Sequence, residues 1–176
     1  MVVEFSSTGD AMANSSIRGV LSFQITTCDD FLDGLRHVVQ EFLDDDLDSR
    51  RAVTSALWAW HMHEWIYHLK RDEVHKHCCK NFSDEKGFAE WLLVQPERTS
   101  LAIIKDIANG SKHCMLNRPV PGETQTMLHN GGFSDAFDDG FDISRLEVKF
   151  AKNIHGFRLA LMQVLAFWET LLPKLT

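Results

Sequence analysis

The feature that most constrains this fold is a long stretch, residues 48–78, that contains neither proline nor glycine. Those two residues are the strongest interrupters of an α-helix. Apolar residues recur through the stretch at helical spacing, namely Val53, Ala56, Leu57, Trp60, Trp65 and Leu69. The stretch therefore predicts one long helix over 48–78, which would form the spine of a mainly helical protein.

Capping residues and apolar periodicity predict four further helices. They cover 28–43 with Thr27 as the cap, a segment from Ser83 that ends before Pro96, a segment capped by Thr99 or Ser100, and 156–172. The residue before a proline is pushed out of the helical region, which sets the end of the second of these.

Two short runs have the alternation of β-strands instead, TQTML (124–128) and RLEVKFA (145–151). We expect them to pair as an antiparallel hairpin, with the remainder of 117–151 as loop. Residues 1–26 fit either strand or loop. The prediction is a single domain over 1–176, mainly α, built as an up-and-down helical bundle of four to five helices with a small β-hairpin element.

The net charge of the chain and its cysteine spacing limit which partners and which cellular compartment are expected. A formal net charge of -7 argues against nonspecific DNA binding and against an anionic membrane surface, because both partners demand a basic face. There is no apolar run long enough to span a bilayer and no export signal, so we expect no membrane partner. The four cysteines show no CxxC spacing, which favours reduced thiols and a cytoplasmic location.

The segment WHMHEWIYH places three histidines, His61, His63 and His68, within the predicted spine. His63, Glu64 and His68 resemble the HExxH zinc motif but have one residue too many. Five residues along a helix turn the side chain by about 140° net, so His63 and His68 are expected to diverge. The zinc-protease interpretation therefore fails.

His61, Glu64 and His68 are separated by three and four residues, which places them along one stripe of a helix. They could line a polar ligand groove or help to hold a metal. They could equally be a solvent-facing polar stripe, so we assign no metal. Farther along, His75, Cys78 and Cys79 lie one turn apart and would suit a soft metal only with further ligands.

The segment KDIANGSKHC (105–114) has polar residues at helical spacing. Asp106, Asn109 and His113 share one face if the helix continues through them. Alternatively, Asn109 and Gly110 end the helix, and Lys112 and His113 complement its C-terminal dipole. No phosphate-cradle, dinucleotide or nucleophile-elbow motif is present, and we expect no cofactor.

WHMHEWIYHL, IIKDIANGSKH, the glycine- and phenylalanine-rich loop and FWETLL together resemble a group of uncharacterised bacterial helical proteins over about 50–172. That group is similar to the HEPN-like helical bundles. Many of those are dimers in toxin, defence or nucleotide-handling systems, and some cut RNA. The resemblance therefore implies a homodimer, which the load of large aromatic side chains also favours, and an RNA or nucleotide ligand.

The ribonuclease motif of these bundles is an arginine, often followed by a polar residue, with a histidine a short distance later. By resemblance His113 corresponds to that histidine, Asp106 to the polar residue and Lys105 to the arginine. Lysine offers a point charge where arginine offers a planar pair of donors.

Three hypotheses follow. The first is a self-associating protein that binds a polar or anionic ligand through Asp106, Asn109, His61, Glu64 and His68. The second is a metal-independent ribonuclease with His113 as acid and base and Lys105 or Lys112 as phosphate ligand. The third is a metal-dependent hydrolase that uses His61, Glu64, His68 and His113.

Overall fold

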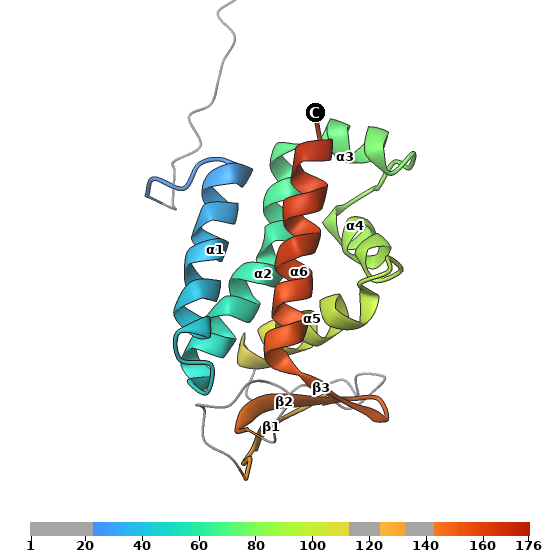
Figure 1. Cartoon of the computed structure of the whole chain (residues 1–176). Coiled ribbons are helices and arrows are strands. Elements are labelled where there is room, and N and C mark those ends of the chain that lie inside the picture. The colour runs from blue at the N-terminus through green and yellow to red at the C-terminus, as the bar shows by residue number, and fades with distance from the viewer. Residues whose placement is uncertain (1–22, 113–123, 133–142) are drawn as a thin grey trace, which may run out of the picture.

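The computed structural model describes residues 23–112, 124–132 and 143–176, and these form helices with one small sheet (Figure 1). The helices are α1 (Cys28–Leu43), α2 (Ser49–Leu69), α3 (Arg71–His77), α4 (Glu85–Leu92), α5 (Arg98–Lys112) and α6 (Phe157–Leu171), followed by a short 3-10 helix (Leu172–Lys174). The strands are β1 (Gln125–His129), β2 (Arg145–Phe150) and β3 (Asn153–Gly156). The predicted class, mainly helical with a small β element, is confirmed.

Local signals set the beginning of α1. The Thr27 hydroxyl accepts a hydrogen bond from the Asp30 amide at 3.0 Å, and the Asp30 carboxylate accepts one from the Thr27 amide at 2.9 Å. This reciprocal pair satisfies two amides that the first turn leaves without helical partners. The predicted helix over 28–43 is confirmed at both ends.

The predicted spine over 48–78 is wrong in its length. The helix breaks at Lys70, whose backbone leaves the helical region with φ -131° and ψ 40°, and α3 continues in a new direction. The Lys70 ammonium donates to the carbonyl of Leu175 at 3.0 Å. Because this contact involves the far end of the chain, the composition of 48–78 gives no sign of the break.

The sequence prediction also places the starts of two helices, α4 and α5, at the wrong residues. Asp84, not Ser83, caps α4 by accepting a hydrogen bond from the Gly87 amide at 2.8 Å. Helix α5 begins at Arg98, and the Ser100 hydroxyl donates to the Gln163 side chain on α6 at 2.6 Å. Ser100 therefore joins two helices instead of capping one.

The predicted hairpin is confirmed, and the sheet has one strand more. β1 pairs antiparallel with β2, with Gln125 opposite Lys149, and β2 pairs antiparallel with β3. β3 was missed because its four residues are too few to show alternation. The tight turn before it places Ala151 at φ 55°, a conformation that sequence rarely signals for a residue other than glycine.

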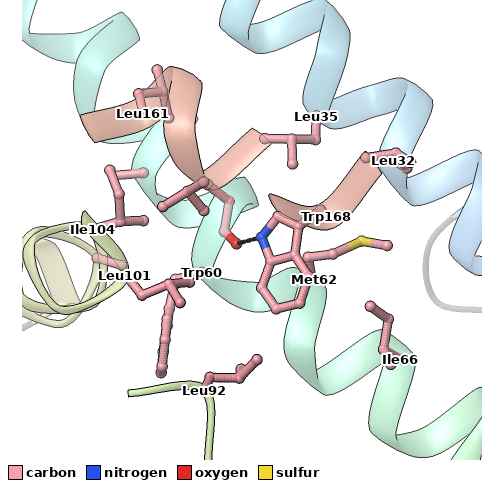
Figure 2. Close-up of a cluster of buried hydrophobic side chains, with 14 of the residues drawn as sticks. Leu32, Leu35, Trp60, Met62, Ile66, Leu92, Leu101, Ile104, Leu161 and Trp168 are labelled. Carbon is pink, nitrogen blue, oxygen red and sulfur yellow. Dashed lines mark hydrogen bonds between the residues drawn. The ribbon is translucent and has the colours of Figure 1, made fainter. Parts of the chain in front are cut away.

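The core lies between α1, α2 and α6, whose axes are roughly aligned, while α5 runs across them and the sheet closes one end (Figure 1). Trp168 of α6 is fully buried, and its indole nitrogen donates to the Ala59 carbonyl at 2.8 Å (Figure 2). Trp60 of α2 is 5% exposed and lies beside Leu101 of α5. Helices α2 and α5 therefore pack against each other around a buried tryptophan.

Helices α1 and α2 approach closely at Gly34. A Cβ atom at this position would overlap the outer ring atoms of Trp58 on α2. Phe31 stacks on the indole rings of both Trp58 and Trp65, with centroids 4.6 and 4.9 Å apart. The absence of a side chain at Gly34 therefore lets this aromatic stack form.

Among the described helices, none combines the length and the apolar character needed to cross a bilayer.

Candidate functional site

The predicted stripe on α2 divides between two carboxylates. His61 Nδ1 lies 2.6 Å from Glu64 Oε1, as the spacing of three residues suggested. His68 does not join them; its Nε2 lies 3.0 Å from Oε2 of Glu85, the first residue of α4. His61 and Glu64 are partly buried, and His68 is exposed. The stripe therefore forms one pair within α2 and one contact to another helix.

Glu85 is the residue that sequence reasoning missed. Its Oε1 lies 3.5 Å from His63 Nε2, while its Oε2 contacts His68. His63 is buried and His68 is exposed, which agrees with their expected divergence, and Glu85 contacts both because it comes from another helix. No spacing within α2 could reveal a partner on another helix.

His63 is the buried member of the group, with 3% of its surface exposed. Its ring packs on the indole of Trp60 with centroids 4.4 Å apart, and its Nδ1 lies 2.5 Å from the Trp60 carbonyl oxygen. Burial lowers the pKa of His63, an effect that the Trp60 carbonyl and the nearby Glu64 and Glu85 carboxylates oppose only in part. The imidazole is therefore predominantly neutral at pH 7.

Together these residues form what we term the imidazole–carboxylate cluster, composed of His61, His63, Glu64, His68 and Glu85. Ligand atoms of His63, Glu64 and Glu85 all lie within 4.8 Å of one another. The cluster therefore combines three imidazoles with two carboxylates. Its electrostatics favour a cation or hydrogen-bond donors over an anion.

Part of the polar face predicted on the KDIANGSKH segment is also present. Helix α5 continues through Asn109 and Gly110 to Lys112, so these residues do not end it. Asp106 accepts a hydrogen bond from the Thr124 hydroxyl at 2.6 Å, and Asn109 is partly buried one turn later. Lys112 is the last residue of α5, and His113 lies outside the described residues.

Trp60 connects the two polar regions. The ammonium of Lys105 lies 6.0 Å from the centroid of the Trp60 ring, against which His63 also packs. A cation at this distance is attracted to the ring electrons. The face of α5 and the imidazole–carboxylate cluster on α2 therefore meet at one indole.

His75, Cys78 and Cys79, the candidate ligands for a soft metal, make other contacts. His75 Nε2 accepts a hydrogen bond from the Phe82 amide at 3.2 Å. Burial raises the pKa of the Cys78 thiol to about 11, which keeps it protonated at neutral pH. Among the described residues, the ligand atoms of these three side chains do not lie within 4.8 Å of one another, so they form no metal-ligand cluster.

No family model matches the chain, and neither the curated proteins nor the solved structures include a match. The fold and site define a mainly helical protein in which a histidine and glutamate cluster adjoins a lysine on a neighbouring helix.

Proposed function

We propose that this chain is a HEPN-like protein, with an up-and-down bundle of four to five helices, that binds a polar or anionic ligand beside α2 and α5. The supporting observation is that Lys105 and His63 pack on the same indole, that of Trp60. Lys105 would receive the anionic group of the ligand, and Glu64 and Glu85 would accept hydrogen bonds from its neutral donors.

RNA or a nucleotide is the ligand class we propose, because its phosphates suit Lys105 and its base and ribose donors suit carboxylates. Asp106 and Asn109 follow Lys105 on α5 and extend the same polar region. Trp60 is too deeply buried to stack on a base, so binding would depend on polar contacts. Such binding weakens as salt concentration rises.

The test is the binding of a labelled single-stranded RNA, measured by fluorescence anisotropy at low and at moderate salt. Lys105→Ala should weaken binding about tenfold, since one charged contact contributes roughly 1–2 kcal/mol. Lys149→Ala, an exposed lysine on β2, is the control with the same change in charge. Equal affinity for the two variants would contradict the proposal.

The same protein and RNA samples can be assayed for cleavage, which tests the ribonuclease alternative. Cleavage of the RNA in the presence of a chelator, abolished by His113→Ala, would favour a metal-independent ribonuclease over a binding protein. Intact RNA throughout would leave binding as the function.

We also propose that two copies associate. Leu159 and Met162 lie one turn apart on α6, are 62% and 46% exposed, and so form an apolar patch that a second copy could cover. Light scattering should then give twice the 20.1 kDa mass of the chain. Leu159→Glu should restore the single mass, whereas a monomeric wild-type protein at high concentration would refute self-association.

A further inference from the structure

We infer that His63, Glu64 and Glu85 bind one divalent transition-metal ion of the zinc type, with His61 and His68 as outer hydrogen-bond partners of the two carboxylates. This site is not the ligand set of His61, Glu64, His68 and His113 that the sequence suggested. It shares Glu64 and Glu85 with the ligand-binding region proposed above, whose charged contact is Lys105 on α5.

The first step concerns which nitrogen of His63 carries the proton. A backbone carbonyl only accepts hydrogen bonds, so Nδ1, which faces the Trp60 oxygen at 2.5 Å, must donate. In the neutral ring Nε2 is then an acceptor with its lone pair available. A histidine that ligates a metal commonly donates its other nitrogen in this way, which fixes the ring and raises its basicity.

The second step concerns the distance from Nε2 to Glu85 Oε1, which is 3.5 Å. It exceeds the usual 2.7–3.2 Å of a direct N–H···O hydrogen bond. Two ligands about 2.0–2.1 Å from a tetrahedral zinc ion lie roughly 3.3–3.4 Å apart. The observed separation therefore fits two ligands of one ion better than a hydrogen-bonded pair.

The third step is the arrangement around the carboxylates. His68 contacts Glu85 Oε2, so the other oxygen is directed toward His63. His61 contacts Glu64 at 2.6 Å and restricts that side chain. The three ligand atoms lie within 4.8 Å of one another, and a movement of about 1 Å brings them to zinc distances.

The ligand chemistry selects the class of metal. One neutral imidazole and two carboxylates balance a divalent charge and suit Zn²⁺, Mn²⁺ or Fe²⁺. Calcium prefers six to eight oxygen ligands, which these residues do not supply. Three protein ligands also leave coordination positions open for water or substrate, as in catalytic zinc sites.

The experiment is isothermal titration of the dialysed protein with Zn²⁺, repeated with Co²⁺, whose visible absorption reports its coordination. The wild type should bind one equivalent, and Glu85→Gln should weaken Zn²⁺ binding at least about tenfold by removing one charged ligand. Glu90→Gln is the matched control, because it makes the same change on the same helix at an exposed residue. His68→Gln should weaken binding about tenfold, whereas His37→Gln, an exposed histidine on α1, should not.

A second measurement excludes a folding artefact. The same Zn²⁺ concentration should raise the thermal midpoint of the wild type and of Glu90→Gln clearly more than that of Glu85→Gln, since stabilisation by a ligand of the folded state grows with its affinity. Equal Zn²⁺ affinity and equal stabilisation for Glu85→Gln and Glu90→Gln would overturn the site. The effect of Lys105→Ala on RNA affinity is a separate readout, so failure of the metal site and failure of RNA binding can be distinguished.

Discussion

The two sides of α2 differ in the side chains that they present to neighbouring helices. Toward α1 and α6 it presents apolar side chains such as Met62 and Ile66, which fill the core. Toward α4 it presents His63 and Glu64, which meet Glu85. The first side contributes burial and should control stability, while the second contributes polar contacts and should control ligand binding.

The largest loss of stability is expected from a substitution in the core, on the apolar side of α2. Trp168→Ala removes the most bulky fully buried side chain and the hydrogen bond to the Ala59 carbonyl. We expect a loss of about 3–5 kcal/mol in the free energy of unfolding, measured by urea denaturation. Phe167→Ala, at its partly buried neighbour, should cost clearly less. Equal losses would show that the core is not centred on Trp168.

Gly34→Ala tests the close approach of α1 and α2. The added Cβ would displace the Trp58 ring from its stack on Phe31, and we expect a loss of about 1–3 kcal/mol together with a changed near-ultraviolet circular dichroism spectrum.

The control for Gly34 is Gly110→Ala on α5, where nothing lies within 4 Å of the added atom. Alanine is the better helix former, so this variant should be more stable than wild type by about 0.5–1 kcal/mol. Two substitutions of the same kind would then have opposite signs. A loss at both positions would contradict the steric explanation.

The pH dependence of stability probes the buried histidine on the polar side. Burial lowers the pKa of folded His63 below its ordinary value of 6.5, so the unfolded chain binds more protons in this range. The free energy of unfolding should therefore be at its full value above pH 6.5 and fall as the pH drops below it. His63→Gln should flatten this dependence, as measured by urea denaturation at a series of pH values.

The contribution of Asp30 to the pH dependence can be separated from that of His63, because the two groups titrate in different pH ranges. Hydrogen bonds from Thr26 and Thr27 lower its pKa below 3.8, so its contribution to stability is lost only in more acidic solution. A wild-type curve and a His63→Gln curve with equal slopes just below pH 6.5 would show that folding does not lower the pKa of His63.

The smallest effect on stability is expected for Glu85→Gln. Without metal, its contacts to His63 and His68 are those of a partly exposed carboxylate, and the loss should stay below about 1 kcal/mol. Thermal denaturation of dialysed protein is the measurement. A loss comparable to that of Trp168→Ala would remove the distinction between the two sides of α2.

Sequence predicted those parts of the fold that local chemistry determines. Thr27 and Asp30 mark the start of α1 because they satisfy its first amides. The alternating apolar residues of RLEVKFA predicted β2, although its charged residue Glu147 is buried beside Val148. The break at Lys70 and the strand β3 were not predictable in this way. The first is accompanied by a contact with Leu175, and the second is too short to have a pattern.

The residues of the candidate site likewise include some that the sequence predicted and some that it could not. His61 and Glu64 were predicted as neighbours because a spacing of three residues brings them together on one helix. Glu85 could not be found, since only the packing of α4 on α2 places it beside His63. His113, which the resemblance to HEPN-like bundles made central, lies outside the described residues and stays a prediction.

The hydrogen bond from Trp168 to the Ala59 carbonyl has a consequence for synthesis on the ribosome. Its two residues are 109 positions apart, and translation at about 5–20 residues per second separates their appearance by roughly 5–20 s. During this interval α1 and α2 have no α6 to cover them, and their apolar surfaces face solvent or a chaperone. The nascent chain is therefore most prone to aggregate before residue 157 is made, and slowing translation there would lengthen that exposure.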